Sequence, residues 1–258
     1  MDRRRLTLAL APFVVIAGTL LFWEGLCRAF SIPPFLLPAP STVAATLIGS
    51  FGAILFNAEY TLFTTLIGFG LSVVVGLALG VLIGAWALAY AGLYPLLVAF
   101  NSVPKVALVP VLVIWFGTGT IPATITAFSA AFLPIAVNVA TGLITVEPEL
   151  KDVLRALGAS RFDVIRLVGI PRSLPYFFAS LKIAVALAFV GAVVSETVAA
   201  DRGIGYLMIA ASSRFDVPLV FAGLAVIAAM GVALYVVCVM IERRYIGWAV
   251  RGAVEGFA

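Results

Sequence analysis

The chain has 258 residues, of which 64% are hydrophobic and 11% are charged, with a net charge of +4. Soluble domains are about half apolar, so water is not the main solvent of this chain. Its apolar residues form long runs without the alternation of barrel strands, and about 20 helical residues cross a bilayer. We therefore predict an all-α, polytopic membrane protein. The basic residues lie at the ends of the apolar runs instead of in one patch, which argues against a nucleic-acid partner.

Residues for metal binding or catalysis are scarce. The chain has two cysteines, Cys27 and Cys238, and no histidine, which are too few for a disulfide framework or a metal cluster. Its carboxylates occur in loops and at helix ends, whereas a membrane enzyme would gather them at one depth. The phosphate-binding loop GxxxxGK[ST] is also missing. We expect a non-catalytic chain that binds no metal or cofactor itself.

The first apolar run is Leu6 to Trp23. A cleaved signal peptide is the alternative, but the run is 18 residues long and no small-x-small cleavage site precedes Glu24. We interpret it as a retained first span. We expect residues 24–60 to form an outer loop with a short amphipathic surface helix, for which Ser41 is a candidate N-cap.

Five further spans complete a single transmembrane domain over residues 1–258, with core spans over 61–241. They are expected at Thr61–Tyr90, Leu93–Phe116, Ile121–Val146, Pro175–Ala199 and Val217–Ile241. The second span carries small residues on which another helix can pack closely. These are Gly68, Gly70, Gly76, Gly80 and Gly84.

The basic residues predict the orientation, because cytoplasmic loops are rich in Lys and Arg. With both termini inside, eleven basic residues lie on the cytoplasmic side. They are Arg3, Arg4, Arg5, Lys151, Arg155, Arg161, Arg166, Arg172, Arg243, Arg244 and Arg251. The outer side then holds Arg28, Arg202 and Arg214. Lys182 is expected to snorkel to the inner interface, which leaves Lys105 deep in the membrane.

A polar stretch at residues 147–172 separates the fourth and fifth spans. The pattern predicts a helix over 151–157, a break at Gly158, and a second helix over 159–168 before Pro171. Phe162 and Arg161 on the second piece combine an apolar anchor with charge, as suits a helix that sits in a partner's groove. We therefore interpret this stretch as a docking element.

Polar residues inside spans are candidates for a transport pathway. Lys105 either faces a cavity or lies at an interface, and Asn101 and Ser102 either share that cavity or bond neighbouring helices. Glu196 lies near the outer end of the fifth span, where we expect a gate or a salt bridge with Arg202 or Arg214.

The polar stretch resembles the EAA motif of binding-protein-dependent ABC importer permeases. The family reads roughly EAA, three residues, G, nine residues, I-x-L-P. Gly158 matches the glycine, Ala159, Ser160 and Arg161 match the usual continuation, and Leu174-Pro175 matches the ending. Asp152, Val153 and Leu154 stand where Glu-Ala-Ala is usual. Four further segments are similar to the nitrate, sulfonate and taurine branch: Pro38-Ala-Pro-Ser, Ser102 to Gly119, Glu196 to Leu207, and Glu242-Arg-Arg ahead of Trp248.

The resemblance implies a type I (MetI-like) permease in a bacterial cytoplasmic membrane. Its partners would be a second copy of the chain, two cytoplasmic ATPases that use ATP and Mg, and an external solute-binding protein. The solute would be a small anion such as a sulfonate, nitrate or a carboxylate. A secondary transporter or channel is the alternative, but we find no convincing internal repeat. The ATPase-coupling residues would be Glu149, Asp152, Arg155, Ala156, Leu157, Gly158, Ala159, Ser160, Arg161 and Phe162.

Overall fold

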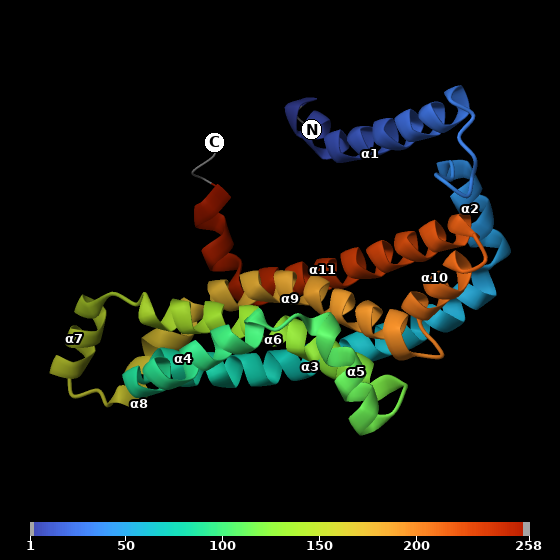
Figure 1. The fold of residues 1–258 in the computed structure, drawn as a ribbon. Coiled ribbons are helices and arrows are strands. Elements are labelled where there is room, and N and C mark those ends of the chain that lie inside the picture. Colours follow the sequence, from blue (N-terminus) through green and yellow to red (C-terminus); the bar gives the residue numbers. More distant parts are fainter. Residues whose placement is uncertain (1–2, 255–258) are drawn as a thin grey trace.

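The computed structural model describes the backbone of residues 3–254 and the side chains of residues 10–246. The described part is helical (Figure 1). Its α-helices are α1 (Arg3–Ala29), α2 (Pro40–Gly49), α3 (Phe51–Ala85), α4 (Ala87–Ser102), α5 (Lys105–Phe116), α6 (Thr120–Ile144), α7 (Pro148–Ala156), α8 (Arg161–Val164), α9 (Ile170–Ala199), α10 (Ile204–Ser212) and α11 (Val217–Val254), and one π-helical turn, η1 (Ile165–Gly169), joins α8 to α9. The side chains of Arg3, Arg4, Arg5, Trp248 and Arg251 lie outside the described ones.

Five of these helices are long and apolar enough to cross a membrane, and the bent pair α4 and α5 brings the number to six. The expected all-α membrane architecture is therefore confirmed. Figure 1 shows that α7 and α8 lie at one end of the bundle, while α2 and α10 lie at the opposite end.

The centre of the bundle is α6, which packs against α3 on one side and α9 on the other. Alanines supply much of this contact: Ala127, Ala131 and Ala136 on α6 and Ala184 and Ala188 on α9 are fully buried. Water does not drive helices together inside a bilayer, so close van der Waals contact has to do so, and small residues permit it.

Glycines bring α3 nearest to α6. A Cβ on Gly80 would lie 2.7 Å from the carbonyl oxygen of Ala136, and Gly68, Gly76 and Gly84 meet α6 just as closely. The predicted small-residue face is thus confirmed at four positions. Gly70 was wrongly included: nothing lies within 4 Å of its Cβ position, because it points away from this face.

The region expected as the outer loop 24–60 is largely helical, which corrects the prediction. α1 continues to Ala29, and α3 begins at Phe51 instead of Thr61. Ser41 is not the N-cap of α2, since α2 begins at Pro40 after Ala39. The backbone N–H and the hydroxyl of Ser41 instead donate to the Glu24 carboxylate, at 2.9 and 2.7 Å.

The third span is broken instead of continuous. α4 and α5 meet at an angle of 90°. Val103 and Pro104 have extended backbones there, because proline has no N–H to continue a helix and disfavours helical geometry in the residue before it. α4 begins at Ala87, so the second span also ends earlier than Tyr90.

The two remaining differences lie near the C-terminus. Residues 204–212 form the short helix α10, which was not predicted from the sequence. α11 continues beyond Ile241 and bends at Ile246, whose backbone is not helical and whose side chain is buried.

The α3–α6 contact predicts the effect of one added methyl group. Gly80→Ala would place its Cβ against the α6 backbone, and overpacking of this kind costs about 1–3 kcal/mol. We expect a lower melting temperature for the purified variant in detergent. Gly70→Ala is the matched control and should melt like the wild type. Equal melting of all three proteins would contradict the packing described here.

Candidate functional site

The loop between α6 and α9 contains the helix, break and second helix that the sequence predicts, and we call the segment from α7 through Gly158 to α8 the elbow. α7 ends at Ala156, and Gly158 has a φ of +86°, which side chains with a Cβ rarely adopt. The N–H of Gly158 donates to the carbonyl of Arg155, and the N–H of Ala159 donates to that of Leu154. These two bonds form a Schellman motif that closes the C-terminus of α7.

A capping box starts the second half of the elbow. The Ser160 hydroxyl accepts from the backbone N–H of Asp163 at 3.2 Å, and the Asp163 carboxylate accepts from the Ser160 N–H at 2.9 Å. The sequence analysis named Ser160 but missed Asp163. The spacing S-x-x-D is a capping signal that would have found it.

The sequence predicted that the second helix ends before Pro171, and this prediction is wrong. The helix passes through the π turn η1 directly into α9, with Pro171 in the first turn of α9. Pro171 lacks the N–H that would continue the helical hydrogen bonds, and it lies just after a π turn, where the α-helical bonding pattern is already interrupted. The wider π turn before it also changes the carbonyl positions with which a proline ring would clash.

Two contacts hold the ends of the loop to the bundle. Glu147, just before α7, pairs with Arg172 at the start of α9 at 3.3 Å. A Cβ on Gly169 would lie 2.8 Å from the Leu143 side chain, so η1 packs closely on α6. The loop is therefore joined to the two central helices at its base.

The tip of the loop presents apolar side chains to its surroundings. Leu157 is 78% exposed and Phe162 is 68% exposed, one on each side of Gly158. Val153 is also exposed. Among the other expected coupling residues, Glu149, Arg155, Ala156, Ser160 and Arg161 are exposed, and Ala159 is half-buried. Asp152, exposed too, lies 3.4 Å from Arg155.

A hollow of about 580 Å³ lies at the junction of α4 and α5, bounded by α6 and α9. Asn101, Ser102 and Lys105 all line it, so the three residues expected to share a cavity do lie together. The sequence analysis missed Asn138 of α6, which lines the same hollow and whose amide donates to the Pro134 carbonyl at 2.8 Å. An asparagine inside an apolar run was the signal for it.

The Lys105 ammonium lies at the C-terminal end of α4. It donates to the backbone carbonyls of Phe100, Asn101 and Val103, at 3.0 to 3.3 Å. Phe100 and Asn101 lie in the last turn of α4, where carbonyls lack the usual i+4 partner, although the Phe100 carbonyl also accepts from the Val103 N–H. A cation there is favoured by the helix dipole. Lys105 thus stabilises the sharp bend and places a positive charge at the wall of the hollow.

Glu196 belongs to a buried network at the opposite end of the bundle from α7. Its side chain is 1% exposed, and Oε2 accepts from the Thr61 hydroxyl at 2.8 Å and from the Gly205 N–H at 3.0 Å. Thr61 in turn accepts from the Ile204 N–H, and Asn57 accepts from the Gly203 N–H. Side chains of α3 and α9 therefore cap the start of α10.

The expected salt bridge of Glu196 is wrong. Among the described side chains, neither Arg202 nor Arg214 pairs with it, and Arg202 lies over the Phe56 ring instead. Gly203 also packs against Glu196: it has a φ of +107°, and a Cβ there would overlap the carboxyl group.

Lys182 was expected to snorkel to the inner interface by itself, but it does not. It pairs with Glu242 of α11 at 2.9 Å. Both side chains are mostly buried, so the pair links α9 to α11 within the bundle.

A family model described as "Binding-protein-dependent transport system inner membrane component" matches residues 72–247, which include the broken span, the elbow and Glu196 itself. The chain belongs to this family. It is a membrane-embedded ABC transporter permease, and subunits of this family transport without catalysing a reaction. Its apolar helices are consistent with a bacterial inner membrane.

Two curated relatives cover the chain almost completely. The riboflavin transport system permease protein RibX of Chloroflexus aurantiacus is 34% identical over 93% of this chain and 90% of its own. The taurine transport system permease protein TauC of Escherichia coli is 28% identical over 95% of this chain and 90% of its own. The relatives that match this permease are therefore named after different solutes.

A solved structure supports the fold. The MetNI methionine ABC transporter matches with a TM-score of 0.63 and 18% identity, over 76% of this chain and 97% of that one. The expected MetI-like permease fold is thus confirmed.

The Glu196 network predicts that the Thr61 hydroxyl stabilises the end of the permease that carries α10. Thr61→Val keeps the shape but leaves the Ile204 N–H and the Glu196 carboxylate each short of a bond, at about 1–3 kcal/mol for a buried polar group. We expect a lower melting temperature and faster proteolysis between α9 and α10. Thr61→Ser keeps the hydroxyl and should resemble the wild type. A Val variant as stable as the Ser variant would contradict this role.

Proposed function

We propose that this permease moves a small solute into the cytoplasm through a dimeric pathway driven by two separate ATP-binding-cassette ATPases. The observation that carries the proposal is the exposed apolar elbow, held at its base to the helices that also line the hollow. A partner that moves the elbow would move α6 and α9, and with them two walls of the hollow.

The elbow is the proposed contact with the ATPases. Leu157 and Phe162 offer apolar anchors on either side of Gly158, in the manner of a helix that sits in a groove. The ATPases would bind and hydrolyse ATP with Mg, since this chain lacks the phosphate-binding loop. An external solute-binding protein would deliver the solute at the end of the bundle that carries α10.

A second copy of the chain is the proposed partner in the membrane. The hollow is bounded by α4, α5, α6 and α9 of one copy and is partly open, so a second copy is needed to complete a pathway. Both termini are proposed to be cytoplasmic, on the side of the elbow. The excess of Lys and Arg on that side supports this orientation.

The proposed solute class is a small anion, such as a sulfonate, nitrate or a carboxylate. Support comes from Lys105, whose charge lies at the wall of the hollow, and from the name of the taurine permease. The riboflavin permease name points to an uncharged solute. The three N–H donors of the Lys105 ammonium are bonded to the carbonyls of Phe100, Asn101 and Val103. Lys105 would therefore act on an anion through its electric field instead of through a direct hydrogen bond.

The elbow predicts that Gly158→Val uncouples ATP hydrolysis from transport. No atom lies within 4 Å of a Cβ at this position, so the effect would come from the backbone, where a left-handed conformation costs about 1–2 kcal/mol for residues other than glycine. Gly158→Asn is the control, because asparagine tolerates this conformation. The measurement is solute-stimulated ATPase activity of the reconstituted transporter. Wild-type stimulation in the Val variant would rule out a role for the elbow geometry.

The Lys105 charge predicts a selective loss of anion uptake. In liposomes that contain the full transporter, Lys105→Gln should slow uptake of nitrate or an alkanesulfonate by about tenfold, the scale of electrostatic focusing. Uptake of uncharged riboflavin, where the transporter accepts it, should not change. Lys105→Arg keeps the charge and is the matched control. Unchanged anion uptake in the Gln variant would place Lys105 outside the pathway and remove the argument for an anion.

A further inference from the structure

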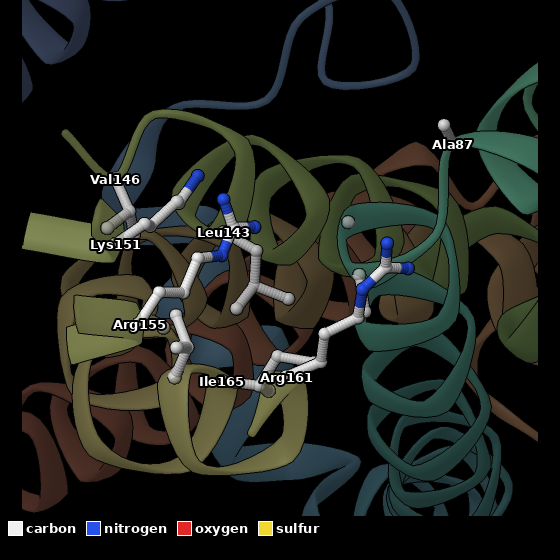
Figure 2. A pocket seen from close by; sticks show the side chains of 11 residues that line it. Ala87, Leu143, Val146, Lys151, Arg155, Arg161 and Ile165 are labelled. Carbon is white, nitrogen blue, oxygen red and sulfur yellow. The ribbon is translucent and has the colours of Figure 1, made fainter. Parts of the chain in front are cut away.

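A second, smaller hollow of about 260 Å³ lies between the elbow and the end of α3, away from the Lys105 hollow. Three cations line it: Lys151 and Arg155, four residues apart on α7, and Arg161 of α8. Figure 2 shows their side chains extending in the same direction from these two helices. Like charges repel, so three cations around one small hollow indicate a site for an anion.

Carboxylates do not neutralise this hollow. None of the residues that line it is acidic. Asp152 meets Arg155 at 3.4 Å in an exposed pair, which contributes little, and Asp163 is bonded to Ser160 in the capping box. Glu147 pairs with Arg172. The positive charge of Lys151 and Arg161 therefore has no ion-pair partner among the described residues.

The start of α4 adds to the positive potential. Ala87, its first residue, lines the hollow, and its N-cap Trp86 makes no side-chain cap. The free N–H groups of such a helix start, together with the helix dipole, favour an anion, and phosphate is a frequent one. Ala85 and Ala87 on this side of the hollow have small side chains.

The floor of the hollow is apolar. Leu143, Val146 and Val164 line it and are buried in the protein. α3, a membrane-spanning helix, ends here at Ala85, and the half-exposed Trp86 follows, as is typical of the membrane interface. A charged rim above an apolar floor at this depth suits a phosphate group that carries hydrocarbon.

We propose that this hollow binds the phosphate group of an anionic phospholipid of the cytoplasmic leaflet. The phosphate meets Lys151, Arg155 and Arg161, and the glycerol and upper acyl chain lie on the apolar floor. The lipid thereby links α7 and α8 to the α3–α4 junction. The choice of the cytoplasmic leaflet rests on the orientation proposed above. The inference does not depend on which solute the permease carries, and its test uses the permease chain alone.

The first test compares purified chains in nanodiscs of phosphatidylcholine, with and without phosphatidylglycerol. Native mass spectrometry counts retained phosphatidylglycerol, and thermal unfolding reports its stabilisation. Arg155→Gln with Arg161→Gln should weaken retention about 25-fold, because each basic residue at an anionic surface contributes about fivefold. Arg166→Gln removes an exposed charge from the same loop outside the hollow and should retain the lipid. Equal retention by the double variant and this control would overturn the proposal.

Two further arms keep the test decisive. Inorganic phosphate, added to the wild type in phosphatidylcholine, should not reproduce the stabilisation; if it does, the ligand is a soluble anion and the lipid proposal is wrong. The second arm needs no arginine variant: Trp23, Trp115 and Trp248 are replaced by Phe, so that Trp86 alone reports. Brominated phosphatidylglycerol should quench Trp86 more strongly than brominated phosphatidylcholine, and equal quenching would overturn the proposal.

Discussion

Close contact between helix backbones is the constraint on which this permease depends. In a bilayer the helices gain little from excluding water, so α3, α6 and α9 are held together by van der Waals contact. That contact requires glycine or alanine wherever the axes approach, as at Gly80 against Ala136 and at Gly191, where a Cβ would lie 2.7 Å from the carbonyl oxygen of Thr126. Some buried hydroxyls bond a neighbouring helix, as Ser72 does at the Phe128 carbonyl, whereas others, such as Ser180, donate to a carbonyl of their own helix.

The same three helices connect the regions that we assign to transport. α6 and α9 continue into the elbow at one end, line the Lys105 hollow in the middle, and α9 carries Glu196 at the other end. The elbow is fixed at its base by the Glu147–Arg172 pair and by Gly169 against Leu143. A force on the elbow is therefore expected to reach the hollow through packed helices, without a flexible joint between them.

Local signals in the sequence predicted local structure well. The positive φ at Gly158 and the packing of Gly80 follow from properties of single residues and their spacing. Contacts between distant segments were not predictable in this way. Glu196 was assigned an arginine partner because charge was the visible signal, whereas the fold supplies Thr61 and a backbone N–H. The bend at Pro104 was missed since hydropathy does not distinguish a straight span from a broken one.

The claim that the apolar elbow holds the ATPases is tested most directly by copurification. The permease would be expressed with its ATP-binding-cassette subunit, as wild type, as Leu157→Asp with Phe162→Asp, and as Phe215→Asp. Phe215 is similarly exposed but lies between α10 and α11, at the opposite end of the bundle. We predict that the ATPase copurifies with the wild type and with the Phe215 variant but is lost from the elbow variant. Full recovery of the ATPase with a folded elbow variant would contradict it.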